Sequence, residues 1–258
     1  MQYRLKAKGV DMKNKICMVL LLFFFFTVIS YSSQEQNQII KLSLLDKDIK
    51  EQLMIFAACR EEWIIKDYDP FLCGYTVYDL DEDGMLELIS HVTAGTALIA
   101  KNTFYHADTE SGEINVLKQV YNENFFMLNL EGKLEFYQDT ESGKKYYLSS
   151  YKGKSGIEYI CADGFFYLED GYVYNETIRS YFLYARGKDN DEYHYYDENG
   201  NEISESKWEE KYTNFFKNKE GLKSGTSWMW MYYEDAMAAT EMEILFKLYD
   251  IYVQGCSD

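Results

Sequence analysis

The hydrophobic and polar positions of the chain fall into three successive patterns. Residues 39–66 place apolar side chains at helical spacing, which predicts one helix or two short ones. From residue 74 to about residue 203, the chain consists of short, aromatic, alternating runs, which are typical of β-strands. Residues 206–255 return to helical spacing and predict two closing helices.

The predicted helices are defined by their apolar faces and by their ends. The apolar positions of the first helical segment are Ile40, Leu44, Ile49, Leu53, Phe56 and Ala57. The second segment begins with a capping box made of Ser206 and Glu209. The third, residues 227–255, ends at a helix-stopping glycine, Gly255. Its apolar face, which we expect to cover the sheet, contains Trp228, Met231, Ala238, Met242, Leu245 and Leu248.

Glycine-containing turn signals separate the alternating runs of the middle region. They are Ser111-Gly112, Glu131-Gly132, Ser142-Gly143, Asp163-Gly164, Asp170-Gly171 and Asn199-Gly200. The word DTESG occurs at Asp108 and again at Asp139, which suggests two similar hairpins. The whole pattern predicts an α+β fold, in which an antiparallel meander of about eight to ten strands carries an N-terminal helix and two C-terminal helices.

The N-terminal residues have the features of an export signal. Lys13 and Lys15 precede an apolar run of 14 residues, 16–29, and the small residues Ser30 and Ser32 follow it. This run is shorter than the about 20 residues of a membrane span, so we predict a signal peptide over residues 1–32. The alternative is an uncleaved N-terminal anchor. In either case we expect the protein to be secreted or held at the cell surface, without nucleic-acid partners.

The rest of the chain suits one domain. Residues 33–258 are expected to form a single α+β domain, helical at 39–67, β-rich at 74–203 and helical at 206–255. The whole chain has a net charge of −17, and residues 1–32 hold five basic residues and one acidic residue, so the exported part carries about −21. A surface with this charge repels phosphate backbones and anionic lipid head groups, which excludes nucleic acid as a partner.

Four cysteines remain after export: Cys59, Cys73, Cys161 and Cys256. Four cysteines allow three pairings in an oxidising exterior, and the alternative is that they are unpaired, buried thiols. The only three histidines, His91, His106 and His194, are far apart in the sequence, and no Cys/His spacing suits zinc.

The most distinctive candidate site is an acidic loop within "YTVYDLDEDGMLELISHV", residues 75–92. Its acids alternate along the chain and precede a glycine, so that their side chains can converge on one centre. Calcium suits such a site because it accepts six to eight oxygen ligands in flexible geometry, whereas magnesium requires a stricter octahedron. The predicted ligands are Asp79, Asp81, Asp83, the carbonyl of Met85, and Glu87.

The loop differs from an EF-hand, because position 12 is Ser90 where that motif needs glutamate. Its strand-like flanks match D-x-D-x-D-G-x-x-[DE]-L instead. The words "YDLDEDGMLELI" resemble the calcium loop of FG-GAP/VCBS-type (integrin-like) repeats, and the chain resembles uncharacterised secreted proteins of gut Firmicutes that carry "YDIDGDGxPELI". The resemblance implies the same five ligands in a β-hairpin loop. This chain departs from the pattern at Glu82, which replaces a glycine and is expected to face outward, and at Met85-Leu86.

Two alternatives remain for the loop: a solvated acidic turn, or a catalytic role. A second candidate for chemistry is "CADGFFYLEDGYVYNE", residues 161–176, where Asp163, Glu169 and Asp170 stand among aromatic residues. These acids are either hydrolytic or parts of two hairpin turns at Asp163-Gly164 and Asp170-Gly171. The chain has no G-x-S-x-G, P-loop or HExxH motif.

The 25 tyrosines offer amphipathic stacking surface for sugars or protein partners, or one ring of each adjacent pair fills the core. The sequence therefore favours a secreted or cell-surface, non-enzymatic calcium-binding protein that binds an extracellular protein or glycan through an aromatic sheet face. The alternative is a secreted glycan hydrolase with acids from residues 163–176. A third possibility is a structural envelope protein held by an uncleaved anchor.

Overall fold

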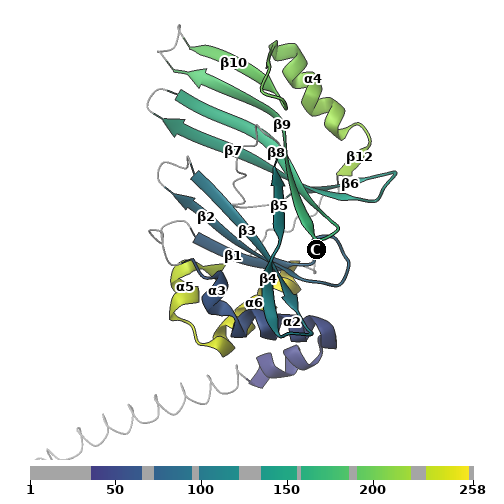
Figure 1. Ribbon diagram of the computed structural model, residues 1–258, viewed down its shortest axis with the longest axis vertical. Helices are drawn as coiled ribbons and strands as arrows, with labels where there is room; N and C mark the ends of the chain where they lie inside the picture. The colour runs from purple at the N-terminus through teal and green to yellow at the C-terminus, as the bar shows by residue number, and fades with distance from the viewer. Residues whose placement is uncertain are drawn as a thin grey trace, which may run out of the picture. The chain divides into compact units, whose positions relative to one another are not determined.

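The structure is a computed structural model, shown as a ribbon in Figure 1. It describes residues 36–65, 73–94, 99–121, 135–155, 158–185, 191–221 and 231–255. The chain divides into two units, Met1–Asp46 and Lys47–Asp258. The expected signal peptide, the turn at Glu131-Gly132, and Trp228 and Cys256 lie outside the described residues.

The N-terminal helical segment forms three helices within the described residues, where one helix or two short ones were expected. Residues 36–43 of the first unit are helical, and the second unit begins with α2 (Lys47–Ala58) and α3 (Arg60–Trp63). Leu53, Phe56 and Ala57 are buried as predicted. Ile40 and Leu44 are exposed instead, at 57% and 80%. Helical spacing alone thus identified the buried face of α2 correctly, but not that of the preceding segment.

The first sheet has the strand order β13-β1-β2-β3-β4, and all its pairs are antiparallel. Its strands are β1 (Cys73–Tyr78), β2 (Glu87–Ala94), β3 (Ile99–Asp108), β4 (Glu113–Val116) and β13 (Met231–Tyr232). Helices α2, α5 (Tyr233–Ala238) and α6 (Glu241–Gly255) pack against this sheet (Figure 1). Helices from the start and from the end of the second unit thus pack against the same sheet.

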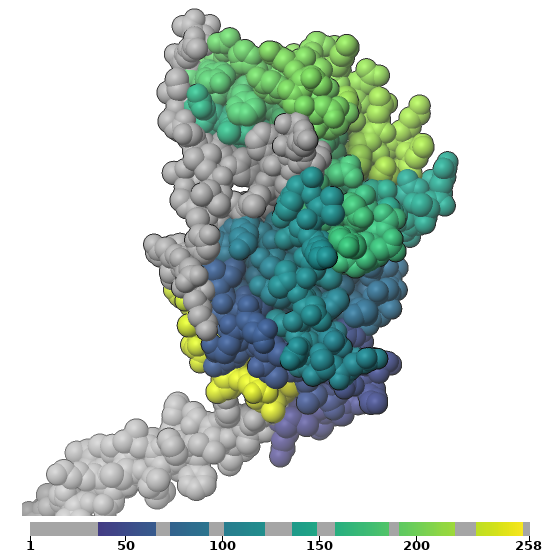
Figure 2. Space-filling model, viewed as in Figure 1, coloured from purple at the N-terminus to yellow at the C-terminus, as the bar shows by residue number. Residues whose placement is uncertain are grey.

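The second sheet has eight strands, with the order β11-β10-β9-β8-β7-β6-β12 and with β5 paired to β9. They are β5 (Lys118–Tyr121), β6 (Glu135–Asp139), β7 (Lys145–Ser155), β8 (Glu158–Glu169), β9 (Tyr172–Tyr184), β10 (Glu192–Asp197), β11 (Glu202–Ile203) and β12 (Lys219–Gly221). The β5–β9 pair is parallel, and the others are antiparallel. On the face drawn in Figure 2, the teal atoms of β5 adjoin the green atoms of β9.

The predicted α+β class is confirmed, with helices at both ends of a strand-rich region. The described strands number thirteen and form two sheets, whereas the sequence suggested one meander of about eight to ten. The chain passes from the first sheet to the second at Leu117, whose N–H donates to the carbonyl of Phe104 at 2.8 Å. Alternating polarity shows that a strand has one buried face, but it does not show which sheet the strand joins.

One core cluster lies between the two sheets. It contains Leu80, Ile89, Phe104, Leu117, Tyr147, Phe166, Leu168 and Val173. Phe104 of the first sheet and Phe166 of the second have ring centroids 5.3 Å apart. Burying a side chain of this size contributes about 1.5–3 kcal/mol to the stability of the fold. Leu80 belongs to the acidic loop, so the loop is anchored in this shared core.

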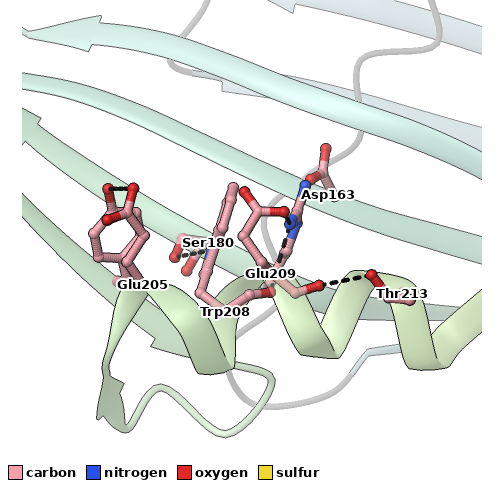
Figure 3. Close-up of polar contacts among 8 residues, drawn as sticks. Asp163, Ser180, Glu205, Trp208, Glu209 and Thr213 are labelled. Atoms are coloured by element: carbon pink, nitrogen blue, oxygen red, sulfur yellow. Dashed lines mark hydrogen bonds and ion pairs between the residues drawn. The ribbon is translucent and has the colours of Figure 1, made fainter.

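Helix α4 (Glu205–Phe216) lies along the second sheet (Figure 1). The predicted capping box at Ser206 is wrong, because β11 ends at Ile203 and the chain enters the helix directly afterwards. Ser204 is the N-cap, and its side chain accepts from the N–H of Lys207. The Nε1–H of Trp208 donates to the carbonyl of Ser180 at 2.9 Å, which fixes the helix on β9 (Figure 3).

Arg179 of β9 completes this anchor. Its guanidinium lies 3.5 Å from the ring centroid of Trp208 and 4.0 Å from that of Tyr212. The same group forms ion pairs with Asp163 at 2.8 Å and with Glu209 at 3.4 Å. Cation–π contacts with desolvated rings contribute up to about 2 kcal/mol, so Arg179 is a principal contact between α4 and the sheet.

The predicted last helix, residues 227–255, is wrong in its first part. Met231–Tyr232 is strand β13, and α5 ends before α6 begins. Ala239 between them is extended, and Thr240 forms a capping box with Glu243: the Thr240 N–H donates to the Glu243 carboxylate at 2.7 Å, and the Glu243 N–H donates to the Thr240 hydroxyl at 3.3 Å. Helix α6 runs to Gly255, the last of the described residues, so its predicted end there stays a prediction.

The two DTESG words form the same turn, as predicted. Asp108 accepts from the N–H groups of Glu110 and Ser111 at 2.9 and 3.3 Å. Asp139 accepts from those of Glu141 and Ser142 at 3.0 and 2.8 Å. In each turn the glycine that follows has a positive φ, +73° at Gly112 and +72° at Gly143.

The predicted turn at Asp163-Gly164 is wrong. Both residues lie inside β8, at a register shift against β9. Aspartate-glycine is a turn signal, but glycine is also tolerated at a β-bulge, and the local sequence does not separate the two cases. The turn at Asp170-Gly171 does join β8 to β9, with positive φ at both residues.

Candidate metal centre

The acidic loop connects β1 to β2, and its flanks are strands, as predicted. Tyr78 pairs with Glu87, so the loop proper covers residues 79–86. Leu80 and Leu86 are 1% and 0% exposed, whereas the residues from 81 to 85 are exposed. Two apolar residues therefore hold the loop at its two ends and leave the acidic residues between them near the surface.

Three of the predicted acidic ligands lie together. Asp79, Asp81 and Glu87 each present one carboxylate oxygen, and these oxygens all lie within 4.8 Å of one another. Two oxygens bound to the same calcium ion at 2.3–2.6 Å are at most roughly 5 Å apart. The spacing of the three carboxylates thus fits a common calcium ion.

Two of these carboxylates are held partly out of water. Glu87 is only 3% exposed, and its Oε2 accepts from the N–H of Leu80 at 2.9 Å. Asp79 accepts from the N–H of Gly84 through Oδ2 at 3.1 Å. Its other oxygen, Oδ1, is buried and has no hydrogen-bond partner in the described part of the chain. A buried carboxylate oxygen without a donor is costly, and a cation would satisfy it.

The fourth predicted acidic ligand, Asp83, is not in this cluster. The Oδ1 of Asp83 accepts from the N–H of Met85 at 2.7 Å, which places this carboxylate at the turn. The side chain of Met85 is 39% exposed. The roles of the Asp83 carboxylate and of the Met85 carbonyl as ligands stay predictions.

Two residues of the loop have left-handed backbone conformations. Gly84 has φ +88°, as the glycine at that position predicts. Glu82 has φ +61°, which costs a non-glycine residue roughly 1–2 kcal/mol. Its side chain is 68% exposed, as expected, and its carboxylate pairs with the ammonium of Lys145 in β7. This contact between the two sheets was not evident in the sequence.

Burial and mutual repulsion act on the three clustered acids in the same direction. Burial raises the pKa of Asp79 and of Asp81 above the ordinary range, and the nearby charge of Asp83 adds to the effect. Burial raises the pKa of Glu87 well above its usual value, the Leu80 N–H opposes this, and the charges of Asp81 and Asp79 strengthen it. A cation among these oxygens would reverse these costs.

Three residues from other elements support the loop and were missed by sequence reasoning. They are Gln52 of α2 and Lys145 and Tyr147 of β7. The only sequence signal is at Gln52, a polar residue three positions after Ile49 on the apolar face of its helix. The sequence contains no signal that pairs β7 with the loop, because the contact is set by how the two sheets pack.

Three acids of the second candidate region, Asp163, Glu169 and Glu176, have partners, and Asp170 lies in the turn between β8 and β9. Asp163 pairs with Arg179, and Glu169 pairs with Lys144 at 2.7 Å. The hydroxyl of Tyr167 donates to Glu176 at 3.4 Å. These contacts hold strands and helix together, which is the structural role that charged cross-strand pairs commonly have.

The aromatic residues form a row on one face of the second sheet. Tyr146 and Tyr167 have ring centroids 5.4 Å apart, and Tyr167 stacks on Tyr174 at 4.9 Å. The neighbouring Tyr147 is buried on the opposite face, with its ring stacked on Phe166 at 5.0 Å. Adjacent tyrosines in β7 therefore point to opposite faces: one forms part of the row and the other fills the core.

Cys59, Cys73 and Cys161 are free thiols, of which Cys73 is buried and the other two are half-buried. The Nδ1 of His91, a buried residue, lies 2.7 Å from the side-chain oxygen of Asn102 on the neighbouring strand. His194 lies 3.1 and 2.8 Å from the carboxylates of Glu192 and Glu202. Neither histidine belongs to the acidic cluster.

A pocket of about 830 Å³ lies between α2, α6 and the β3–β4 turn. Its lining includes Met54, Ile55, Met242 and Leu245, with Lys50 among the charged residues. It contains neither the acidic loop nor an acid from residues 163–176. The pocket therefore does not contribute to the cation cluster.

None of the helices in the described ranges is both long enough and apolar enough to cross a membrane. Comparisons with protein-family models, with curated proteins and with solved structures gave no match. The interpretation of the acidic loop therefore depends on its own residues and geometry.

Proposed function

We propose that this chain is a secreted or cell-surface, non-enzymatic calcium-binding protein. The ion is bound in the β1–β2 loop by Asp79, Asp81 and Glu87, and Asp83 and the Met85 carbonyl complete the ligand set. The observation that carries this proposal is the group of three carboxylates within 4.8 Å of one another, together with the buried, unpartnered Oδ1 of Asp79.

Calcium is the cation that suits this donor set best. The donors are carboxylate oxygens, with a carbonyl oxygen nearby, and these are the ligands of hard cations. The loop residues from 79 to 87 include neither histidine nor cysteine. Calcium tolerates the irregular geometry of a loop with two left-handed residues, whereas magnesium requires near-octahedral sites and keeps several waters.

The ion would stabilise the native state by mass action. A ligand that binds only the native state adds about 2.7 kcal/mol to the free energy of unfolding when its concentration is 100 times its Kd. Extracellular modules bind calcium with Kd values of about 10⁻⁴–10⁻³ M. A site of this kind would be filled outside the cell, which agrees with the proposed export.

The proposed partner is an extracellular protein or glycan. The support is the aromatic row of the second sheet and the exposed tyrosines near it, Tyr121 and Tyr172, at 44% and 37%. Tyrosine combines an apolar ring with a polar edge and is enriched in interfaces. Because Asp163, Glu169 and Glu176 each have a structural contact, we favour binding over hydrolysis.

The test of calcium binding is a comparison of thermal melts of the full chain in calcium and in chelator, joined to calorimetric titration. We expect a melting temperature several degrees higher in calcium, and loss of this difference in Asp81→Asn. Glu110→Gln, in an exposed acidic turn outside the cluster, is the control and should keep the full calcium response. Equal melts in calcium and chelator, with no heat of binding, would exclude the calcium site.

A further inference from the structure

The acidic loop is bound by side chains from two elements outside its own hairpin. Gln52 reaches it from α2, which precedes the hairpin, and Lys145 and Tyr147 reach it from β7 of the second sheet. Lys145 and Tyr147 are two residues apart in a strand, so both side chains point to the same face. These contacts suggest that the state of the loop affects more than its own hairpin.

Gln52 holds the backbone on both sides of Met85. Its Nε2–H donates to the carbonyl of Gly84 at 2.9 Å, and its Oε1 accepts from the N–H of Leu86 at 2.6 Å. Gln52 is 3% exposed, so water does not compete strongly for these bonds. Met85, whose carbonyl is a predicted ligand, is therefore held in place by α2.

Tyr147 holds the backbone between Asp79 and Asp81. Its hydroxyl donates to the carbonyl of Leu80, and the N–H of Leu80 donates to the carboxylate of Glu87 at 2.9 Å. Tyr147 is 1% exposed and packs in the second sheet. Through its N–H and its carbonyl, Leu80 thus links Glu87 of the acidic cluster to Tyr147 of β7.

Lys145 supplies a positive charge beside the loop. Its side chain is 7% exposed, and its ammonium contacts the carboxylate of Glu82 and lies 5.2 Å from the ring centroid of Phe136. A buried ammonium requires a nearby negative charge. The same ammonium reduces repulsion among the acids when no cation is bound, and it repels a divalent cation that enters the site.

On the premise of the proposed calcium site, we propose that Gln52, Tyr147 and Lys145 are positioning residues. They couple binding of calcium in the loop to α2 and to the second sheet. Without calcium, repulsion among Asp79, Asp81 and Glu87 loosens the bonds at Leu80 and Leu86. With calcium, the same bonds are held, and β7 is held with them. Lys145 acts as an internal counter-charge that lowers the affinity for calcium.

The experiment uses two matched pairs of variants in the full chain. Tyr147→Phe removes only a hydroxyl, and Tyr146→Phe is its neighbour on the opposite face of β7. Lys145→Met removes the internal counter-charge, and Lys144→Met is its control, because Lys144 pairs with Glu169 instead. For each variant, calcium affinity is measured by calorimetric titration.

We expect Tyr147→Phe to weaken calcium binding by about threefold to tenfold, which corresponds to the loss of one hydrogen bond. We expect Lys145→Met to tighten it by a similar factor and to lower the melting temperature of the calcium-free protein. The two controls should remain within about twofold of the original protein. Lys145 and Tyr147 are neighbours on one face of β7. General destabilisation would not change the calcium affinity in opposite directions in their two variants.

Hydrogen exchange of the unaltered protein provides a readout that needs no variant. Calcium should slow exchange at the amides of β7 and of α2 around Gln52, as well as in the loop. If calcium binds but exchange in β7 and the variant affinities match the controls, the coupling is wrong and the calcium site stands. If the unaltered protein binds no calcium, the proposed function itself fails.

Discussion

The protein contains two kinds of acidic turn that differ in how their carboxylates are satisfied. In the DTESG turns, Asp108 and Asp139 are half-buried and accept from backbone N–H groups two and three residues later. A hydrogen bond from the Ser111 side chain, together with these backbone N–H groups, lowers the pKa of Asp108. The N–H of Ser142, its hydroxyl and the N–H of Glu141 lower the pKa of Asp139. The carboxylates of both turns are stable as anions in water without a cation.

The carboxylates of the β1–β2 loop are less well satisfied by hydrogen bonds than those of the DTESG turns. Of the loop's clustered acids, Glu87 is buried, Asp79 is half-buried and Asp81 is exposed. Burial raises the pKa values of Asp79 and Glu87, and the Oδ1 of Asp79 has no donor within the described residues. The comparison shows that the density of acids does not by itself identify a cation site. A cation site is indicated when the acids are withdrawn from water and their negative charge is left uncompensated.

The largest expected effect is the loss of calcium from this loop. Glu87→Gln removes one charge from the most buried ligand and should lower calcium affinity by at least about tenfold, which is about 1.4 kcal/mol. At a fixed calcium concentration, most of the rise in melting temperature should disappear. The matched change Asp139→Asn in a DTESG turn should leave calcium affinity unchanged. An equal loss in both variants would remove the distinction between the two turns.

The second expected effect is a pH dependence of opposite sign in the two turns, measured in chelator. Carboxyls whose pKa is raised in the folded state stabilise it while protonated, so the contribution of Glu87 is present below about pH 4 and is lost as the pH rises through its raised pKa. For Asp139 the pKa is lowered, so its contribution is present above about pH 4 and is lost on acidification.

Thermal melts between pH 3 and pH 7 measure both contributions against the original protein. As the pH rises, the melting temperature of Glu87→Gln should increase relative to that of the original protein. The melting temperature of Asp139→Asn should decrease relative to it. The same sign in both variants would contradict the assignment of a buried, uncompensated cluster to the β1–β2 loop alone.

Local spacing was sufficient to predict that three acids of the β1–β2 loop lie together, and it was insufficient for the residues that support the loop. Asp79, Asp81 and Glu87 lie within nine consecutive residues, so the D-x-D-x-D-G pattern predicts their convergence. Lys145 and Tyr147 come from a strand nearly 60 residues later, and they reach the loop only because two sheets share a core. Contacts of this kind depend on packing and leave no periodic signal in the sequence.

The elements show the same distinction. The DTESG turns could be predicted, because a side chain and a glycine determine them within five residues. The strand at Asp163-Gly164 could not, because these residues pair with Arg179 and Thr177 of β9 across a register shift that leaves Ile178 without a partner on β8. Likewise, the break at Ala239 between α5 and α6 follows from the Thr240–Glu243 capping box within a segment of continuous helical pattern.

A third, smaller effect concerns the left-handed residues of the two turns. The DTESG turns place glycine at their left-handed position, at Gly112 and Gly143. The β1–β2 loop has Glu82 at one of its two such positions, and this residue pairs with Lys145. Glu82→Gly removes backbone strain of roughly 1 kcal/mol, but it leaves a buried ammonium without its partner, so we expect the two effects to offset each other.

A double-mutant cycle separates the two contributions. In the Lys145→Met background no ammonium is left unpaired, so Glu82→Gly should raise the free energy of unfolding by about 1 kcal/mol, measured by chemical denaturation in chelator. In the original background the same change should be close to neutral. A stabilisation of equal size in both backgrounds would mean that the ion pair contributes nothing. The glutamate at this position would then be only a strained substitute for the glycine found in the DTESG turns.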